Sequence, residues 1–193
     1  AGVSAYPQQV TTQMVYNFLR GGAAINVLAR HVGARVVVVD MGVAASLKSH
    51  PALISRKIAY GTGNIAKGPA MTRQQARRAV ETGIEILQRE WDRGLNIVGA
   101  GVTGEPVKNV TGRGTGLDDA QTAHKAKVIE EALSLNRPDP QDAMDVLAKV
   151  GGFEIAGLAG VMLAAAASRI PVVIDGFISG AAALTAVKLC PPV

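Results

Sequence analysis

The sequence is poor in the residues on which several large classes of protein depend. It has one cysteine in 193 residues, Cys190, which excludes an internal disulfide and a Cys-x-x-Cys metal site and is typical of a reducing compartment. The three histidines show neither metal-ligand spacing nor a catalytic partner, so we expect no metal and no cofactor. Aromatic residues make up 4% of the chain and do not alternate with basic ones, which argues against stacking on single-stranded nucleic acid.

Long apolar runs are missing as well. The longest, from Ile155 to Ala167, contains glycines and is too short to span a bilayer, and the start of the chain does not resemble a signal peptide. Lys and Arg exceed Asp and Glu by five (20 − 15), which suits an anionic ligand. The densest basic group, Arg73, Arg77 and Arg78, shares its predicted helix with glutamates and is expected to be a solvated face. We therefore expect a soluble, cytoplasmic protein that binds neither nucleic acid nor membrane.

Helical and strand patterns alternate along the chain. Apolar spacing predicts helices at 7–31 with an interruption at Gly21-Gly22, then at 72–93, 118–135, 141–150, 155–168 and 179–189. Short apolar, β-branched runs predict buried strands at 35–40, 95–99 and 170–175. Each strand follows a helix and precedes a loop that contains glycine. This order predicts an α/β fold with a doubly wound, mainly parallel sheet flanked by helices, Rossmann-like and forming a single large domain over residues 1–193.

A sheet of this kind binds its ligands at the carboxyl ends of the strands. We therefore expect Asp40, residues 99–101 and residues 175–177 to line one crevice. Asp175 closes an apolar strand, where it can bind a ribose hydroxyl or hold a loop amide. No dinucleotide fingerprint follows any of the strands, which argues against an oxidoreductase that uses a nicotinamide dinucleotide.

Two glycine-rich loops can approach a ligand with their backbone. The loop Tyr60-Gly-Thr-Gly-Asn64 can turn N–H groups toward an anion or a ring edge, although a plain connecting loop explains it equally well. The second, Gly112-Arg-Gly-Thr-Gly116, leads into a helix that bears Lys125. Glycines at a helix N-terminus can bind phosphate, while Lys125 by itself is equally well explained as a surface lysine. The glycines and alanines of residues 151–160 favour closely crossing helices over ligand contact. The residues alone thus indicate an α/β protein that binds a phosphorylated ligand, without a defined reaction.

Six stretches, taken together and in order, resemble one enzyme family. They are 2–7, 60–71, 111–117, 149–154, 159–162 and 174–178. Each is weak alone, but the ordered set is similar to the nicotinate-nucleotide–dimethylbenzimidazole phosphoribosyltransferase family, which makes the lower nucleotide loop of cobalamin. The resemblance implies a transferase that displaces nicotinate from C1′ of nicotinate mononucleotide with a ring nitrogen of 5,6-dimethylbenzimidazole. Alignment of base and sugar then provides most of the catalysis, and a carboxylate general base removes the proton.

The resemblance also implies substrate-binding positions. Lys125 matches a lysine near the phosphate, and the adjoining loop is Gly112, Arg113, Gly114, Thr115 and Gly116. A second loop bordering the crevice is Asp175, Gly176 and Phe177. The benzimidazole pocket corresponds to Ser4, Tyr6 and Met14, and another loop of the site to Gly61, Gly63 and Asn64. The substrates are small molecules, and the family's habit suggests a homodimer.

The chain departs from the family in three places. It lacks a segment before Ala1, a long segment beyond Val193 that holds the glutamate taken to be the general base, and a loop with a second acidic residue between Gly101 and Val102. Either a mobile active-site loop has been left out of the sequence or the chain is truncated. No general base can be named, Glu105 does not fill the gap, and the chain by itself is expected to be inactive. A nucleotide-binding or sensor protein that kept the fold and lost the chemistry is the alternative.

Overall fold

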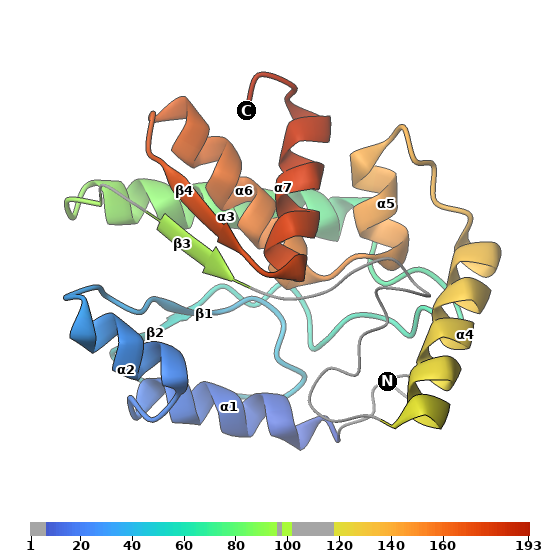
Figure 1. Cartoon of the computed structure of the whole chain (residues 1–193), viewed down its shortest axis with the longest axis horizontal. Coiled ribbons are helices and arrows are strands. Elements are labelled where there is room, and N and C mark those ends of the chain that lie inside the picture. The colour runs from blue at the N-terminus through green and yellow to red at the C-terminus, as the bar shows by residue number, and fades with distance from the viewer. Residues whose placement is uncertain (1–6, 96–97, 102–117) are drawn as a thin grey trace. The chain divides into compact units, whose positions relative to one another are not determined.

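The computed structural model describes residues 7–95, 98–101 and 118–193 (Figure 1). The elements of this part are α1 (Gln9–Leu19), α2 (Ala24–His31), β1 (Val38–Asp40), β2 (Leu53–Ser55), α3 (Arg73–Trp91), β3 (Val98–Gly101), α4 (Asp119–Asn136), α5 (Ala143–Val150), α6 (Phe153–Ala167), β4 (Val172–Asp175) and α7 (Phe177–Leu189). They belong to two compact units, Ala1–Thr62 and Gly63–Val193, referred to below as the first and second units.

The first unit contains a short parallel strand pair and two helices. β1 and β2 pair in parallel, with Asp40 opposite Ser55. The pairing continues beyond the strands, because the N–H group of Gly61 donates to the carbonyl oxygen of Gly42 at 2.9 Å. Residues 56–61 therefore run beside the loop that follows β1. The helices α1 and α2 lie on either side of Gly21-Gly22, where the sequence predicted the interruption.

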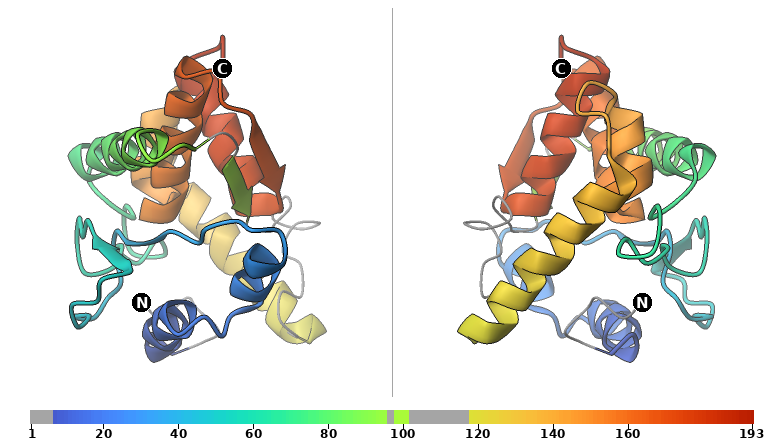
Figure 2. Two further views of the ribbon diagram at one scale, coloured as in Figure 1. Left: turned by 90° about the vertical axis from the view of Figure 1, so that its left-hand side faces the viewer. Right: turned by 90° about the vertical axis from the view of Figure 1, so that its right-hand side faces the viewer.

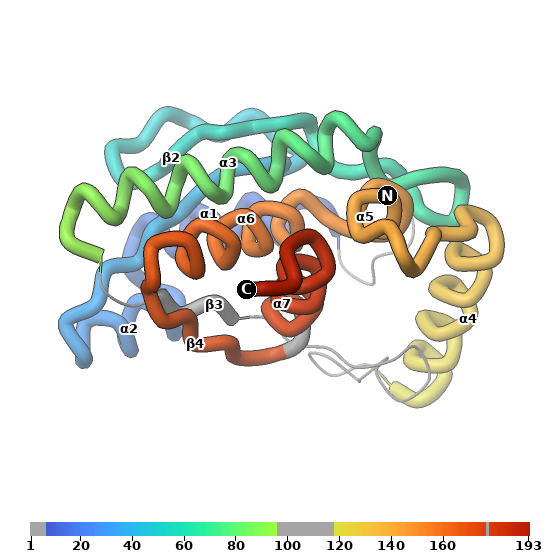
Figure 3. Tube along the Cα trace, turned by 90° about the horizontal axis from the view of Figure 1, so that it is seen from above, coloured from blue at the N-terminus to red at the C-terminus, as the bar shows by residue number. Residues whose placement is uncertain are grey.

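The second unit is built from layers of helices around a second parallel strand pair. β3 and β4 pair with Gly101 opposite Asp175. Figure 3 shows α6 between α3 on one side and the strand pair with α7 on the other. The long helix α4 contacts α5 and extends away from this stack (Figure 2). The carboxyl ends of β3 and β4 thus lie next to each other, at the start of α7.

The contact between α3 and α6 is made by small residues. Three alanines of these helices are completely buried: Ala76 and Ala79 on α3 and Ala156 on α6. A Cβ atom on Gly83 would lie 2.9 Å from the carbonyl carbon of Gly157, and one on Gly160 would lie 2.8 Å from that of Val80. The two backbones are therefore too close for any side chain at these glycines. The prediction that the glycines of residues 151–160 serve close helix packing is confirmed.

The structure confirms a mixed α/β chain with parallel strand pairing, and the doubly wound sheet stays a prediction. All predicted helices and strands are present, with ends that differ by a few residues. The strand β2 was not predicted, because its three residues carry only two apolar side chains and no helical pattern precedes them. The described residues show two separate parallel pairs where one doubly wound sheet was expected. Within the same residues, no helix is both long enough and apolar enough to cross a membrane.

Candidate functional site

The backbone of the predicted glycine loop is tightly constrained. Gly61 has a φ of +83°, in the left-handed region that favours glycine. The N–H group of Gly63 donates to the carbonyl oxygen of Ala70 at 2.6 Å. The carboxamide oxygen of Asn64 accepts a hydrogen bond from the N–H group of Ala66 at 3.0 Å, which closes a local turn. The amide nitrogen of Asn64 carries two further N–H donors. The part of the loop that begins at Gly63 is therefore held by its own hydrogen bonds.

The second half of this loop, residues 63–71, is attached to the ends of two helices. Asn136, the last residue of α4, donates from its amide nitrogen to the carbonyl oxygens of Ile65 (2.8 Å) and Ala132 (2.9 Å). The N–H group of Met71 donates to the carbonyl oxygen of Ala148 on α5 at 2.9 Å. Nothing local in the sequence indicates that Asn136 has a partner 71 positions away. The same helix, α4, bears Lys125.

A charged pair fixes the helices that follow the loop. Arg73, in the first turn of α3, donates to both carboxylate oxygens of Asp142, at 2.6 and 3.2 Å. Asp142 also caps α5 by accepting hydrogen bonds from the N–H groups of Met144 and Asp145. The hydrogen bond from Arg73 is the main reason why the pKa of Asp142 lies below its usual value of 3.8. The predicted solvated face of α3 is confirmed by the exposed pair of Arg77 with Glu81, which are 2.8 Å apart.

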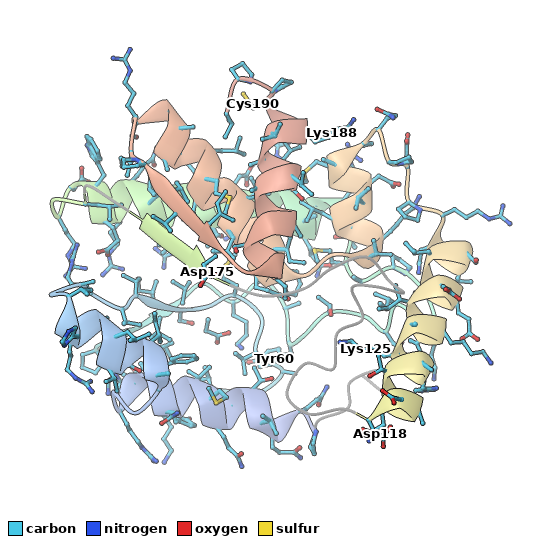
Figure 4. The ribbon with its side chains drawn as sticks, viewed as in Figure 1. Tyr60, Asp118, Lys125, Asp175, Lys188 and Cys190 are labelled. Atoms are coloured by element: carbon cyan, nitrogen blue, oxygen red, sulfur yellow. The ribbon has the colours of Figure 1, made fainter. Side chains whose placement is uncertain are left out.

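The N-terminus of α4 differs from the phosphate site that the sequence suggested. Asp118 accepts a hydrogen bond from the N–H group of Gln121 at 2.8 Å, and Gln121 caps the N–H group of Asp118 in return at 3.0 Å. Asp119 adds a second carboxylate in the first turn. A phosphate at this helix end would meet two carboxylates. Lys125 is exposed two turns further along (Figure 4), so its side chain is the better candidate for the anion contact.

The turn after β4 is fixed by a serine that sequence reasoning missed. The hydroxyl group of Ser179 is completely buried and donates a shared hydrogen bond to the carbonyl oxygens of Asp175 (2.5 Å) and Gly176 (2.9 Å). The side chain of Asp175 is exposed (Figure 4), so it is open to a ligand. α7 starts at Gly176 without a side-chain cap or an acidic residue in its first turn. The first turn of α7, unlike that of α4, carries no carboxylate, and the carboxylate nearest in sequence is that of Asp175, just before the N-cap.

Asp40 does not line a crevice as predicted. It is 2% exposed, its carboxylate lies 2.8 Å from the ammonium group of Lys57, and it accepts hydrogen bonds from the N–H groups of Gly42 and Val43. A carboxylate with these partners inside the protein is not open to substrate. In the second unit, Gly101 and Asp175 are opposite each other at the strand ends, while a crevice lined by residues 99–101 and 175–177 stays a prediction.

The remaining predicted positions are only partly described. Ser4, Tyr6 and the loop Gly112, Arg113, Gly114, Thr115 and Gly116 lie outside the described residues, as does the side chain of Phe177. Met14 is 41% exposed on α1. Lys125 and Asp175 lie on separate elements and apart in Figure 4. Among the described residues, no three His, Cys, Asp or Glu side chains gather as a metal site would require.

Two surface hollows lie away from the predicted positions. One, of about 250 Å³, is mostly apolar and lies between α6, β4 and α7, where it is lined by Met162, Val172 and Val187. The other, of about 230 Å³, lies in the first unit and is lined by Phe18, Asn26 and Val38. No predicted substrate-binding residue lines either hollow. The candidate site therefore rests on the loops and helix ends described above.

Several known proteins similar to this chain share one name. The chain is 62% identical over 208 aligned positions to the nicotinate-nucleotide–dimethylbenzimidazole phosphoribosyltransferase of Roseiflexus sp. (strain RS-1), with 100% of this chain and 59% of that protein covered. It is 60% identical, with the same coverage, to the protein of that name from Desulforudis audaxviator (strain MP104C). The crystal structure of CobT from Thermus thermophilus matches with a TM-score of 0.88 and 40% identity, over 98% of this chain and 62% of that one.

The chain thus spans about three fifths of the length of these relatives. The alignment with the Roseiflexus protein is 15 positions longer than the chain itself (208 − 193). The DBI_PRT phosphoribosyltransferase family model matches in two parts, residues 1–104 and 100–193, which together cover the whole chain. The chain therefore belongs to this phosphoribosyltransferase family, as its ordered motifs predicted.

Proposed function

We propose that this chain forms the greater part of an enzyme that transfers the phosphoribosyl group of nicotinate mononucleotide to 5,6-dimethylbenzimidazole. The observation that carries the proposal is the match of the whole chain, at 62% identity, to a protein named for this reaction. The bond between C1′ and the nicotinate nitrogen breaks, and a bond between C1′ and a benzimidazole nitrogen forms. The proton on the other benzimidazole nitrogen passes to a carboxylate. The products are nicotinate and α-ribazole 5′-phosphate.

The roles of the residues follow from their chemistry. The pyridinium of nicotinate mononucleotide is already a good leaving group, so the protein has mainly to hold base and sugar in line. Lys125 pairs with the phosphate, together with residues 112–116. Asp175 binds a ribose hydroxyl at the turn that continues through Gly176 and Phe177. Ser4, Tyr6 and Met14 shape the benzimidazole pocket, and Gly61, Gly63 and Asn64 border it with their backbone and amide groups.

This chain covers 59% of the Roseiflexus protein, and we propose that the general base lies in the part of that protein with no counterpart in this chain. We propose that a loop is missing between Gly101 and Val102. Two findings support this position: the 15 extra positions in the alignment, and the division of the family match near residues 100–104. We further propose that the missing segments complete one Rossmann-like, doubly wound sheet in a single domain, since both observed strand pairs are parallel. A cytoplasmic homodimer remains our prediction for the assembled enzyme.

Substitution of Lys125 tests the proposed phosphate contact. Titration calorimetry of the chain with nicotinate mononucleotide should show weaker binding for Lys125→Ala than for the unchanged protein. A charge-assisted contact is worth about 1.5–3 kcal/mol, or roughly tenfold to 150-fold in Kd. Lys127→Ala is the matched control, since Lys127 is exposed on the same helix and lies 3.9 Å from Glu131. Equal binding by the two variants would assign Lys125 to the solvated surface.

The reaction itself is tested by restoring what is missing. If the general base lies in the unmatched part of the relatives, as proposed, the chain alone should release no nicotinate. A chimera that contains the corresponding loop and C-terminal segment of the Roseiflexus relative should release nicotinate only when dimethylbenzimidazole is present. A chimera that binds nicotinate mononucleotide and never releases nicotinate would favour the alternative of a nucleotide sensor.

A further inference from the structure

A buried ion pair lies at the centre of the first unit. The carboxylate of Asp40, 2% exposed, is 2.8 Å from the ammonium group of Lys57, 17% exposed. Removing two charges from water is unfavourable unless good geometry and additional hydrogen bonds compensate for it. A pair at this position therefore needs a structural or functional reason.

Every hydrogen-bond donor of Lys57 is used inside the protein. An ammonium group has three N–H bonds. These reach the carboxylate of Asp40 and the carbonyl oxygens of Val43 (2.6 Å) and Ala45 (3.2 Å). The other carboxylate oxygen of Asp40 accepts the N–H groups of Gly42 (3.1 Å) and Val43 (2.9 Å). Lys57 consequently has no donor left for a substrate anion. It can affect substrate binding only through the residues that it contacts.

Those residues lead directly into the glycine loop. The ammonium group lies 4.7 Å from the centre of the Tyr60 ring, a cation–π distance. The hydroxyl groups of Tyr60 and Ser46 are 3.4 Å apart, and the N–H group of Gly61 donates to the carbonyl oxygen of Gly42 at 2.9 Å. Lys57 thus holds residues 43–45 from one side and the ring of Tyr60 from the other. Residues 43–45 and Tyr60, which Lys57 contacts, in turn set the conformation of Gly61.

We propose that Lys57, fixed by Asp40, is a positioning residue for substrate binding. It sets the ring of Tyr60 and the backbone of Gly61, and so the shape in which the loop meets the nucleotide. This inference rests on the proposed function, in which Gly61 borders the substrate site. No direct contact between Lys57 and substrate is involved.

The test separates positioning from stability. Lys57→Met alone would leave the buried carboxylate of Asp40 without its partner and can fail to fold. The double variant Asp40→Asn, Lys57→Met removes both charges, and the asparagine oxygen can still accept the two loop amides. It should melt close to the unchanged protein and bind nicotinate mononucleotide roughly tenfold more weakly, as displacement of a positioned group predicts. Lys57→Arg, which keeps the cation, should restore binding. Lys48→Met, at an exposed lysine of the same unit, should bind like the unchanged protein.

Amide hydrogen exchange of Gly61 gives a second readout that needs no substrate. Faster exchange at Gly61 in the double variant supports the inference, even if the unchanged chain fails to bind nicotinate mononucleotide and the proposed function is wrong. Unchanged exchange at Gly61, or unchanged nucleotide binding by a folded double variant, would overturn it. The inference would also be wrong if Lys57→Arg bound nicotinate mononucleotide as weakly as the double variant does.

Discussion

The close contact of α3 with α6 gives the sharpest prediction, the effect of Gly160→Ala. The added Cβ atom would lie 2.8 Å from the carbonyl carbon of Val80, where ordinary van der Waals contact begins at 3.4 Å. The carbonyl oxygen of Val80 would be closer still, so the helices must separate by more than the 0.6 Å (3.4 − 2.8) that the carbonyl carbon alone requires. A gap of about 0.5–1 Å forfeits a quarter to a half of the dispersion attraction between the atoms that face each other.

The change in the free energy of unfolding can be estimated from two opposing effects, overpacking and helix propensity. Overpacking of a well-packed core costs about 1–3 kcal/mol or more, and here the obstacle is a helical backbone that cannot rotate away as a side chain can. Replacing glycine with alanine in a helix stabilises it by about 1 kcal/mol. We expect the free energy of unfolding to fall by about 2 kcal/mol, which lowers the Tm by roughly 4–8 °C in a chain of this size.

A matched glycine on α7 provides the control. A Cβ atom on Gly180 would meet nothing within 4 Å, so Gly180→Ala should gain about 0.5–1 kcal/mol from helix propensity alone. Both variants are compared by urea unfolding followed by far-ultraviolet circular dichroism, which reports the loss of helix. If Gly160→Ala proves as stable as Gly180→Ala, the helices are further apart than the structure shows and the argument is wrong.

Two further predictions concern the helix ends near the candidate site. Ser179→Ala removes a buried hydrogen bond to the turn at Asp175, so unfolding by urea should show a loss of about 1 kcal/mol, and an unchanged value would contradict the contact. Asp142 has a pKa below 3.8 in the folded protein, so its stabilising contribution is present above that value and disappears as the pH falls through the lowered pKa. Asp142→Asn keeps the helix cap, so its Tm should lie below that of the unchanged protein at neutral pH and approach it in acid. A difference that does not vary with pH would refute this assignment.

The sequence predicted the local features of the fold better than the partners of its charged residues. Helices and strands were predictable because their apolar spacing and the breaks at Gly21-Gly22 are local signals. The glycines of α6 at the α3–α6 crossing were interpreted correctly from composition, although their partners on α3, Val80 and Gly83, were not identified. The strand β2 was not predicted because a pattern of three residues is too short to recognise.

The candidate site was harder to predict because the residues that hold its loops in place are distant from them in the sequence. Asp40 looks like a ligand-binding residue at a strand end, and only its pairing with Lys57, 17 positions later, shows that it faces inward. Asn136 and Ser179 bond to main-chain oxygens, and such bonds leave no pattern in a sequence. The functional assignment came from the order of the motifs, because glycine loops by themselves are compatible with many phosphorylated ligands.

The attachment of the loop 63–71 has a consequence for how this protein can change. The bonds from Asn136 and to α5 involve main-chain atoms of the loop. Replacement of a side chain such as that of Ile65 or Lys67 leaves those bonds in place. The loop can therefore acquire new surface chemistry while its course stays the same.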